Sequence, residues 1–83
     1  MITTLTPNPS IDRTMLVENL LPGEVNRAAS SRTDPGGKGV NVARALIRNG
    51  HPARAVLPLG GPDGELLARL LQNAEVPFDA VPI

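Results

Sequence analysis

The residues with the clearest capacity for chemistry lie in a glycine-rich segment near the middle of the chain. Gly36, Gly37 and Gly39 surround Lys38, and Asn41 follows where apolar residues begin to recur at helical spacing. Glycine lets the backbone approach a ligand without a Cβ in the way, and a helix start aims unpaired N–H groups at that ligand. This combination favours a polar or anionic ligand.

Two familiar glycine motifs do not fit this segment. The P-loop motif requires a Gly and a Ser or Thr at the positions that Arg32 and Gly39 occupy. The dinucleotide fingerprint requires a third small residue where Val42 stands, and residues 33–35 before it do not have a strand pattern. A dinucleotide-binding fold therefore remains only a minor alternative.

A second polar segment, residues 4–12, leaves the end of the first predicted strand. Ligands of open α/β sheets bind at that edge, outside the carboxyl ends of the strands. The carboxylate of Asp12 can accept hydrogen bonds in pairs, which suits the hydroxyl groups of a sugar. Asp12 is thus a candidate ligand-binding residue.

Simpler interpretations of the same residues stay open at this point. Residues 36–39 could be a flexible loop that only leads into a helix, although Lys38 among the glycines weighs against it. Asp12 could be a turn residue that bonds its own backbone. Asn41 could belong to a solvated helix face that it shares with Arg44 and Arg48.

The apolar pattern predicts an α/β protein built from parallel βαβ units. Strands are expected at residues 2–6, 53–57 and 78–83. A first helix is expected over residues 40–48, ended by Asn49-Gly50. A second helix should start at Asp63 as N-cap and bury a stripe formed by Leu66, Leu67, Leu70, Leu71 and Ala74. Strands that alternate with helices imply a parallel sheet with right-handed crossovers.

Two further features complete this architecture. Between residues 7 and 35, extended runs at 11–17 and 24–33 flank a turn at Leu21-Pro22-Gly23 and predict a small two-stranded excursion. Parallel sheets normally carry helices on both faces. Because two helices cannot cover both faces of the sheet, some apolar surface should stay open unless more chain or another copy packs there.

Composition narrows the class of protein and its partners. The 83 residues carry eight Lys and Arg against eight Asp and Glu, so no basic surface for nucleic acid is expected. Cysteine is absent, which excludes disulfides, thiolate metal sites and a cysteine nucleophile. No apolar run approaches the roughly 20 residues of a membrane span, and the first ten residues lack the features of a signal peptide. We therefore expect a soluble, cytoplasmic protein with neither nucleic-acid nor membrane partners.

Four segments together resemble the PfkB (ribokinase-like) family of carbohydrate kinases. They are Thr6-Pro7-Asn8-Pro9-Ser10-Ile11-Asp12, Pro22-Gly23-Glu24-Val25-Asn26-Arg27, Gly36-Gly37-Lys38-Gly39-Val40-Asn41-Val42-Ala43-Arg44 and Gly60-Gly61-Pro62-Asp63-Gly64. The spacing between the segments matches as well, and the resemblance runs along the whole chain. Within the family it points to the branch of 1-phosphofructokinases and tagatose-6-phosphate kinases.

The resemblance implies a ribokinase-like α/β fold in which the excursion serves as a β-sheet lid. It also implies that the γ-phosphoryl group of ATP is transferred, with Mg²⁺, to a sugar-phosphate substrate, here fructose 1-phosphate. By that carry-over Asp12 and Asn41 bind sugar hydroxyls, Gly36 and Gly37 hinge the lid and contact the substrate, and Lys38 meets the sugar's phosphate. Lid closure would expel water, which otherwise competes as the phosphoryl acceptor.

The chain departs from the family in its length. A second family signature, a Gly-Ala-Gly-Asp-like turn whose Asp is the general base, has no counterpart, so no catalytic or metal-binding residue is expected here. We expect residues 1–83 to be the N-terminal part of a kinase domain, with a lid at about 7–35 and the ATP-binding part absent, and to be inactive alone. Alternatives are a non-catalytic module that binds a sugar phosphate or pairs with another chain, and a kinase of tagatose 6-phosphate or fructose 6-phosphate. A homodimer through the lid would cover its free strand edges.

Overall fold

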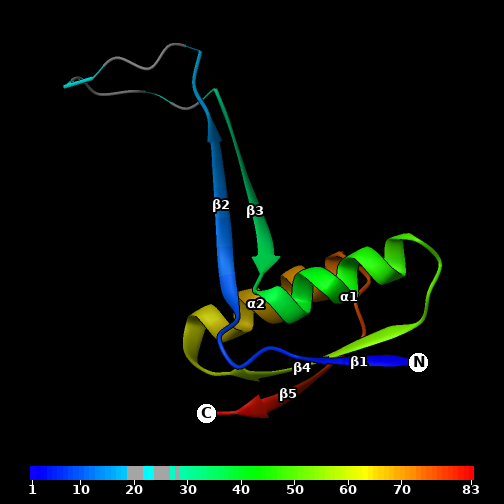
Figure 1. Ribbon diagram of the computed structural model, residues 1–83. Coiled ribbons are helices and arrows are strands. Elements are labelled where there is room, and N and C mark those ends of the chain that lie inside the picture. Colours follow the sequence, from blue (N-terminus) through cyan, green and yellow to red (C-terminus); the bar gives the residue numbers. More distant parts are fainter. Residues whose placement is uncertain (19–21, 24–26, 28) are drawn as a thin grey trace.

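The computed structural model describes residues 1–18, 22–23, 27 and 29–83. A parallel sheet has the strand order β1-β4-β5 and consists of β1 (Ile2–Leu5), β4 (Ala53–Leu59) and β5 (Phe78–Pro82). The connecting helices are α1 (Lys38–Arg48) and α2 (Gly61–Asn73) (Figure 1). The predicted α/β fold with parallel βαβ units is confirmed.

Both helices cover the same face of the sheet (Figure 1). The central strand β4 shows this most clearly, because Ala53, Ala55 and Leu57 are buried while the residues between them are only partly buried. Val40 of α1 and Leu71 of α2 belong to the same buried cluster. Aliphatic side chains thus build the core, as required of a sequence with a single aromatic residue.

The opposite face of the sheet has no helix across it in the described part of the chain (Figure 1). Leu5 lies beside Val56 in the parallel register, and Leu5 and Val81 are 69% and 53% exposed. Arg54 and Asp79 form an ion pair at 3.2 Å on this face. The predicted uncovered apolar surface is confirmed.

The helix α1 begins two residues before the predicted start and ends at the predicted cap. Gly50 has a φ of 82°, and its N–H donates to the carbonyl of Ile47 at 3.0 Å. The N–H of His51 donates to the carbonyl of Leu46 at 2.8 Å. These two bonds form a Schellman motif, which satisfies the last carbonyl groups of the helix.

The prediction that Asp63 caps α2 is wrong. Gly60 is the N-cap, Asp63 lies inside the first turn, and no side chain caps the helix. Pro62 explains the earlier start, because its fixed φ suits the first helical turn and its missing N–H would have no partner there. The predicted buried stripe is confirmed in part: Leu67 and Leu71 are buried and Ala74 packs against the core, whereas Leu66 and Leu70 are only partly buried.

The excursion is an antiparallel hairpin that stands away from the sheet (Figure 1) and consists of β2 (Ser10–Leu16) and β3 (Ser30–Gly36). The predicted bounds of its second strand, 24–33, are wrong at the carboxyl end, and residues 24–26 and 28 lie outside the described residues. A two-stranded hairpin has only edge strands, where proline is tolerated, so Pro35 does not end β3. The hairpin therefore reaches Gly36.

Candidate functional site

A two-glycine junction connects the hairpin to the core. Gly36 ends β3, Lys38 begins α1, and Gly37 between them has a φ of 109°. A residue with a Cβ rarely adopts this conformation, whereas glycine adopts it without steric strain. The chain therefore turns from strand to helix within a single residue.

Asp12 lies against this junction. In the hairpin register Ser10 is opposite Gly36, and Asp12 is opposite Asp34. Ser10 Oγ donates a hydrogen bond to Asp12 Oδ1 at 3.2 Å. A Cβ on Gly36 would lie 2.5 Å from Asp12 Oδ2 and 2.6 Å from Ser10 Oγ. The carboxylate thus occupies the space that a side chain at position 36 would need.

Thr6 fills the space beside the other two glycines. A Cβ on Gly37 would lie 2.7 Å from Thr6 Cγ2, and a Cβ on Gly39 would collide with Thr6 Oγ1. Thr6 is only 3% exposed, and its hydroxyl has no hydrogen-bond partner among the described residues. The sequence suggests that the glycines make room for a ligand. The structure shows that they first make room for the chain's own side chains.

Lys38 and Asn41 lie in the first turn of α1, directly after this two-glycine junction. Both are exposed, and within the described residues neither side chain makes a hydrogen bond or an ion pair. The backbone N–H of Asn41 donates to the carbonyl of Gly37 at 2.9 Å, which ties it to the helix start. The predicted residues Asp12, Gly36, Gly37, Lys38 and Asn41 are therefore gathered around one end of α1.

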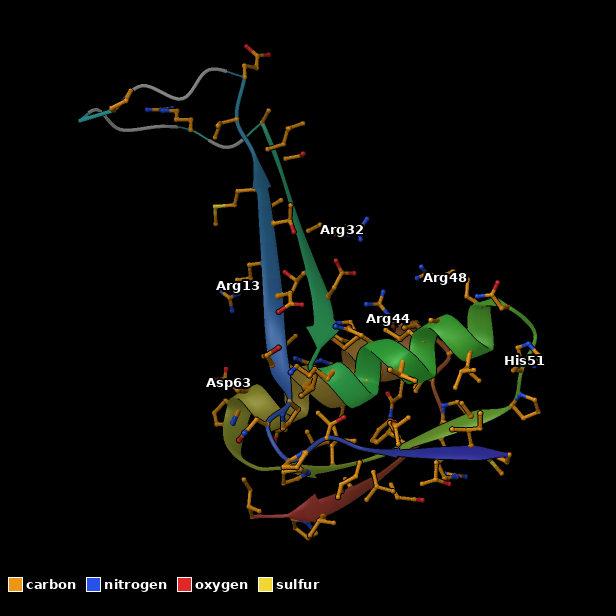
Figure 2. The ribbon with its side chains drawn as sticks, viewed as in Figure 1. Arg13, Arg32, Arg44, Arg48, His51 and Asp63 are labelled. Atoms are coloured by element: carbon orange, nitrogen blue, oxygen red, sulfur yellow. The ribbon has the colours of Figure 1, made fainter. Side chains whose placement is uncertain are left out.

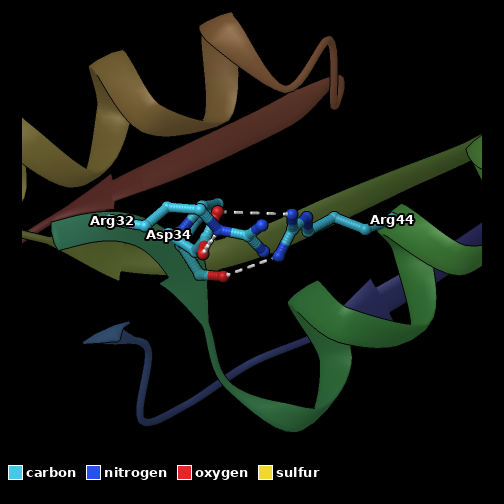
Figure 3. Close-up of polar contacts among 4 residues, drawn as sticks. Arg32, Asp34 and Arg44 are labelled. Carbon is cyan, nitrogen blue, oxygen red and sulfur yellow. Dashed lines mark hydrogen bonds and ion pairs between the residues drawn. The ribbon is translucent and has the colours of Figure 1, made fainter. Parts of the chain in front are cut away.

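A polar cluster occupies the same face of the hairpin as Asp12. Arg32 Nε donates to Asp34 Oδ2 at 2.7 Å, and Arg44 Nη2 lies 3.7 Å from Asp34 Oδ1 (Figure 3). Arg44 Nη1 also donates to the carbonyl oxygen of Pro35 at 3.2 Å. Arg44 is thus not a solvated residue of an exposed helix face, because it joins α1 to β3.

An open cavity of about 550 Å³ lies on the other side of the hairpin base and contains none of the predicted site residues. Arg13, which follows Asp12 in β2, and Asp63 at the start of α2 are among its lining residues. Figure 2 shows these two side chains on one side of the hairpin and Arg44 on the other. Because its charged walls have opposite signs, the cavity has no net preference for an anion.

Residues 1–18, 22–23, 27 and 29–83 contain neither a cluster of metal-ligand side chains nor a membrane-spanning helix. No group of three or more His, Cys, Asp or Glu side chains in these residues could hold a metal ion. No helix among them has both the length and the apolar character that crossing a bilayer requires.

Sequence reasoning did not identify Thr6 and Arg44 as parts of this region. Thr6 directly follows the first strand, at the sheet edge where ligands bind, and this position was the available signal. Arg44 and Asp34 have opposite charges but lie ten residues apart in different elements. Their pairing becomes visible only when the hairpin is placed beside α1.

Comparisons with known proteins give matches along almost the whole chain. Residues 6–83 match the pfkB family carbohydrate kinases. The chain is 46% identical over 82 residues to the ATP-dependent 6-phosphofructokinase isozyme 2 of Mycobacterium tuberculosis, which covers 99% of this chain and 24% of that relative. It is 40% identical over 83 residues to the 1-phosphofructokinase of Bacillus subtilis, with 98% of this chain and 27% of the relative covered.

A solved structure shows the same arrangement of elements. The phosphofructokinase-2 of Escherichia coli in complex with fructose-6-phosphate superimposes with a TM-score of 0.88 at 40% sequence identity. The match covers 98% of this chain and 27% of the Escherichia coli chain, so the chain spans about a quarter of the length of these relatives. The predicted ribokinase-like fold is confirmed over this span.

Proposed function

Since this chain belongs to the pfkB family of carbohydrate kinases, we propose that it forms the sugar-binding part of a cytoplasmic kinase that phosphorylates a ketohexose phosphate. The proposed substrate is fructose 1-phosphate, and the product is fructose 1,6-bisphosphate. Residues 1–83 would be the N-terminal part of the kinase domain, and residues 7–35 would be its lid.

The position of Asp12 at the hinge carries this proposal. One of its carboxylate oxygens accepts a hydrogen bond from Ser10, and the other lies in the space above Gly36. A carboxylate held there can accept hydrogen bonds from two neighbouring hydroxyls of a sugar. Lys38 and Asn41 add a cation and an amide at the same end of α1. An acceptor, an amide and a cation together suit a polyol that carries a phosphate.

Each residue then has a distinct part in binding. Asp12 and Asn41 hold the sugar hydroxyls and so fix the orientation of the ring. Lys38 meets the phosphate as a point charge, and the unpaired N–H groups at the start of α1 favour an anion at the same place. With the phosphate held there, the hydroxyl to be phosphorylated lies at the far end of the sugar.

The hinge glycines would allow the hairpin to close over the bound sugar. Gly37 permits backbone rotation that a residue with a Cβ would resist. Closure would remove water from the reacting hydroxyl, and water is the competing acceptor of the phosphoryl group. The lid residues therefore protect the sugar and hold it in place.

Among the described residues, no group of three or more His, Cys, Asp or Glu side chains could hold the Mg²⁺ of a kinase. We therefore assign no catalytic residue to this chain, and we propose that ATP, Mg²⁺ and the general base are held by sequence outside residues 1–83. ATP would supply the phosphoryl group, and the residues of this chain would bind and orient the acceptor.

The choice of fructose 1-phosphate as substrate rests on the sequence segments and not on the geometry of the site. The matched relatives include a 6-phosphofructokinase and a 1-phosphofructokinase at 46% and 40% identity, which does not separate the two substrates. The preference for fructose 1-phosphate rests on residues 6–12, 22–27 and 36–44, which together resemble the branch of 1-phosphofructokinases and tagatose-6-phosphate kinases. Tagatose 6-phosphate and fructose 6-phosphate remain the alternative substrates.

The test uses the full-length product of the gene, with ATP and Mg²⁺, and compares the three sugar phosphates. We expect the largest kcat/KM for fructose 1-phosphate, by about tenfold or more over the other two, which is about 1.4 kcal/mol of transition-state binding. Asp12→Asn should lower kcat/KM by about 100-fold because the amide accepts fewer hydrogen bonds from the hydroxyls. Arg48→Met, on an exposed turn of α1, serves as the matched control and should change nothing.

Each contrary result has a clear meaning. A protein that transfers phosphate to none of the three sugars contradicts the kinase proposal. Binding of fructose 1-phosphate without any transfer would instead support the alternative of a non-catalytic sugar-phosphate-binding module. A higher kcat/KM with fructose 6-phosphate would overturn only the choice of substrate.

The outer half of the hairpin supports a homodimer through the lid. Met15 and Leu16 are 65% and 63% exposed, and both strands of the hairpin have free edges in the described part of the chain. Pairing with the hairpin of a second copy would cover these edges and apolar side chains. Sedimentation of the full-length protein should therefore show a dimer that Leu16→Lys weakens, and a wild-type monomer would exclude this assembly.

A further inference from the structure

The two carboxylates of the hairpin have different surroundings. Asp12 and Asp34 are direct partners across β2 and β3, so both side chains lie on the same face. Like charges in such positions destabilise a strand pair. Asp34 has an arginine beside each of its oxygens, at 2.7 Å and 3.7 Å, whereas among the described residues Asp12 accepts a side-chain hydrogen bond only from Ser10. Asp34 is thus engaged within the protein, and Asp12 is left for a ligand.

The two arginines that engage Asp34 connect different parts of the molecule. Arg32 belongs to the same strand as Asp34 and its side chain is 77% exposed, so their ion pair is solvated and holds only β3. Arg44 belongs to α1, and its side chain is only 20% exposed. It reaches both Asp34 and the carbonyl of Pro35 (Figure 3). Its contacts therefore cross the hinge from the core to the hairpin.

We infer that Arg44 is a positioning residue for sugar binding, an inference that rests on the proposed function. By holding Asp34 and the Pro35 carbonyl, Arg44 limits the angles that the hairpin can take above α1. The place of Asp12 relative to the start of α1 follows from that angle, because Asp12 and Asp34 are paired in one ladder. Arg44 thus acts on the sugar through the hairpin without touching it.

Loss of Arg44 weakens sugar binding more than it slows phosphoryl transfer. Gly37 lets the hairpin pivot, so without Arg44 the hairpin samples orientations in which Asp12 is out of place. The apparent dissociation constant rises in inverse proportion to the fraction of molecules in the competent orientation. Once the sugar is bound under the lid, phosphoryl transfer starts from the same complex, so kcat changes less than KM.

The test compares Arg44→Met, Arg44→Lys and Arg48→Met in the full-length product of the gene. We expect Arg44→Met to raise KM for fructose 1-phosphate, and Kd from calorimetry, about tenfold or more, while kcat stays within about threefold. Arg44→Lys should weaken sugar binding less than Arg44→Met does, because an ammonium group keeps the charge. It cannot engage both Asp34 and the Pro35 carbonyl as a guanidinium does. Arg48→Met, one turn further along α1, should match the wild type.

The outcomes separate this inference from the proposed function. An Arg44→Met protein with wild-type KM and Kd overturns the inference, as does an equal rise in Arg48→Met. If Arg44→Met does not fold, Asp34→Asn decides, because it removes the anionic partner at nearly the same size: a raised KM supports the inference and a wild-type KM overturns it. A wild-type protein that neither binds nor phosphorylates a ketohexose phosphate contradicts both proposals together.

Discussion

The side chain of Thr6 lies where a Cβ on Gly39 would have to be. The same added Cβ would come within 2.8 Å of the carbonyl oxygen of Leu5. The backbone at the end of β1 and the backbone at the start of α1 are therefore in close contact, with no room for a side chain between them. This packing holds the two-glycine junction at the carboxyl end of β1, where ligands of α/β sheets bind.

Gly39→Ala should destabilise the protein, because the new methyl group must push α1 away from β1. Overpacking of this kind lowers the free energy of unfolding by about 1–3 kcal/mol, and the better helix propensity of alanine offsets about 1 kcal/mol of that loss. Gly64→Ala is the matched control in the first turn of α2, where the nearest atom would lie at 3.2 Å, and it should be nearly neutral. Urea unfolding of the full-length protein measures both. Equal stability of the two variants would contradict the packing described here.

Gly36→Ala should impair sugar binding through Asp12. The new Cβ would lie 2.5 Å from Asp12 Oδ2, so the carboxylate has to move out of place. We expect KM for the sugar phosphate to rise about tenfold. If the effect passes through Asp12, adding Gly36→Ala to the Asp12→Asn variant should raise KM much less than Gly36→Ala does in the wild type. The effects of substitutions at coupled residues are not additive. Full additivity in this double-mutant cycle would show that Gly36 acts by another route.

Lys38→Met should weaken the binding of phosphorylated sugars selectively. An ammonium group beside a phosphate forms a charge-assisted contact, and its loss should raise KM for fructose 1-phosphate about 10- to 100-fold. The affinity for unphosphorylated fructose should not change, which is the internal control. Comparing both ligands by calorimetry measures the difference. A parallel loss for the two sugars would place Lys38 away from the phosphate.

The sequence predicts the core of this fold well because its signals are local. The apolar residues of α1 and α2 recur at helical spacing, and Asn49-Gly50 is a cap whose hydrogen bonds join neighbouring residues. The prediction of an uncovered sheet face also follows from counting elements. The predicted end of β3 and the predicted start of α2 were wrong because two local signals compete at each place. Pro35 can continue an edge strand, and Pro62 can begin a helix before Asp63.

The structure places the residues of the predicted site close together, but the sequence did not predict the contacts that each of them makes. Asp12 and the Gly36 to Asn41 segment could be chosen by residue type and by position at the sheet edge. The partner of each depends on the hairpin register, which turns Asp34 toward Arg44 and places Asp12 over Gly36. The register between two strands so far apart in the sequence cannot be read from residue spacing, although a shift by one residue would exchange the two faces of the hairpin.

Glu75 offers a stabilising substitution far from the site. It follows α2 with a φ of 57°, and its N–H donates to the carbonyl of Gln72 while that of Val76 donates to Leu71, both at 3.0 Å. Gly50 closes α1 with the same pair of bonds and a φ of 82°. Glycine adopts this left-handed conformation without the penalty of a Cβ, so Glu75→Gly should raise the free energy of unfolding by about 1 kcal/mol. Glu75→Ala is the control and should bring no gain, because alanine keeps the Cβ. Urea unfolding of the full-length protein distinguishes them, and a destabilised Glu75→Gly would mean that the carboxylate of Glu75 contributes more than its backbone strain removes.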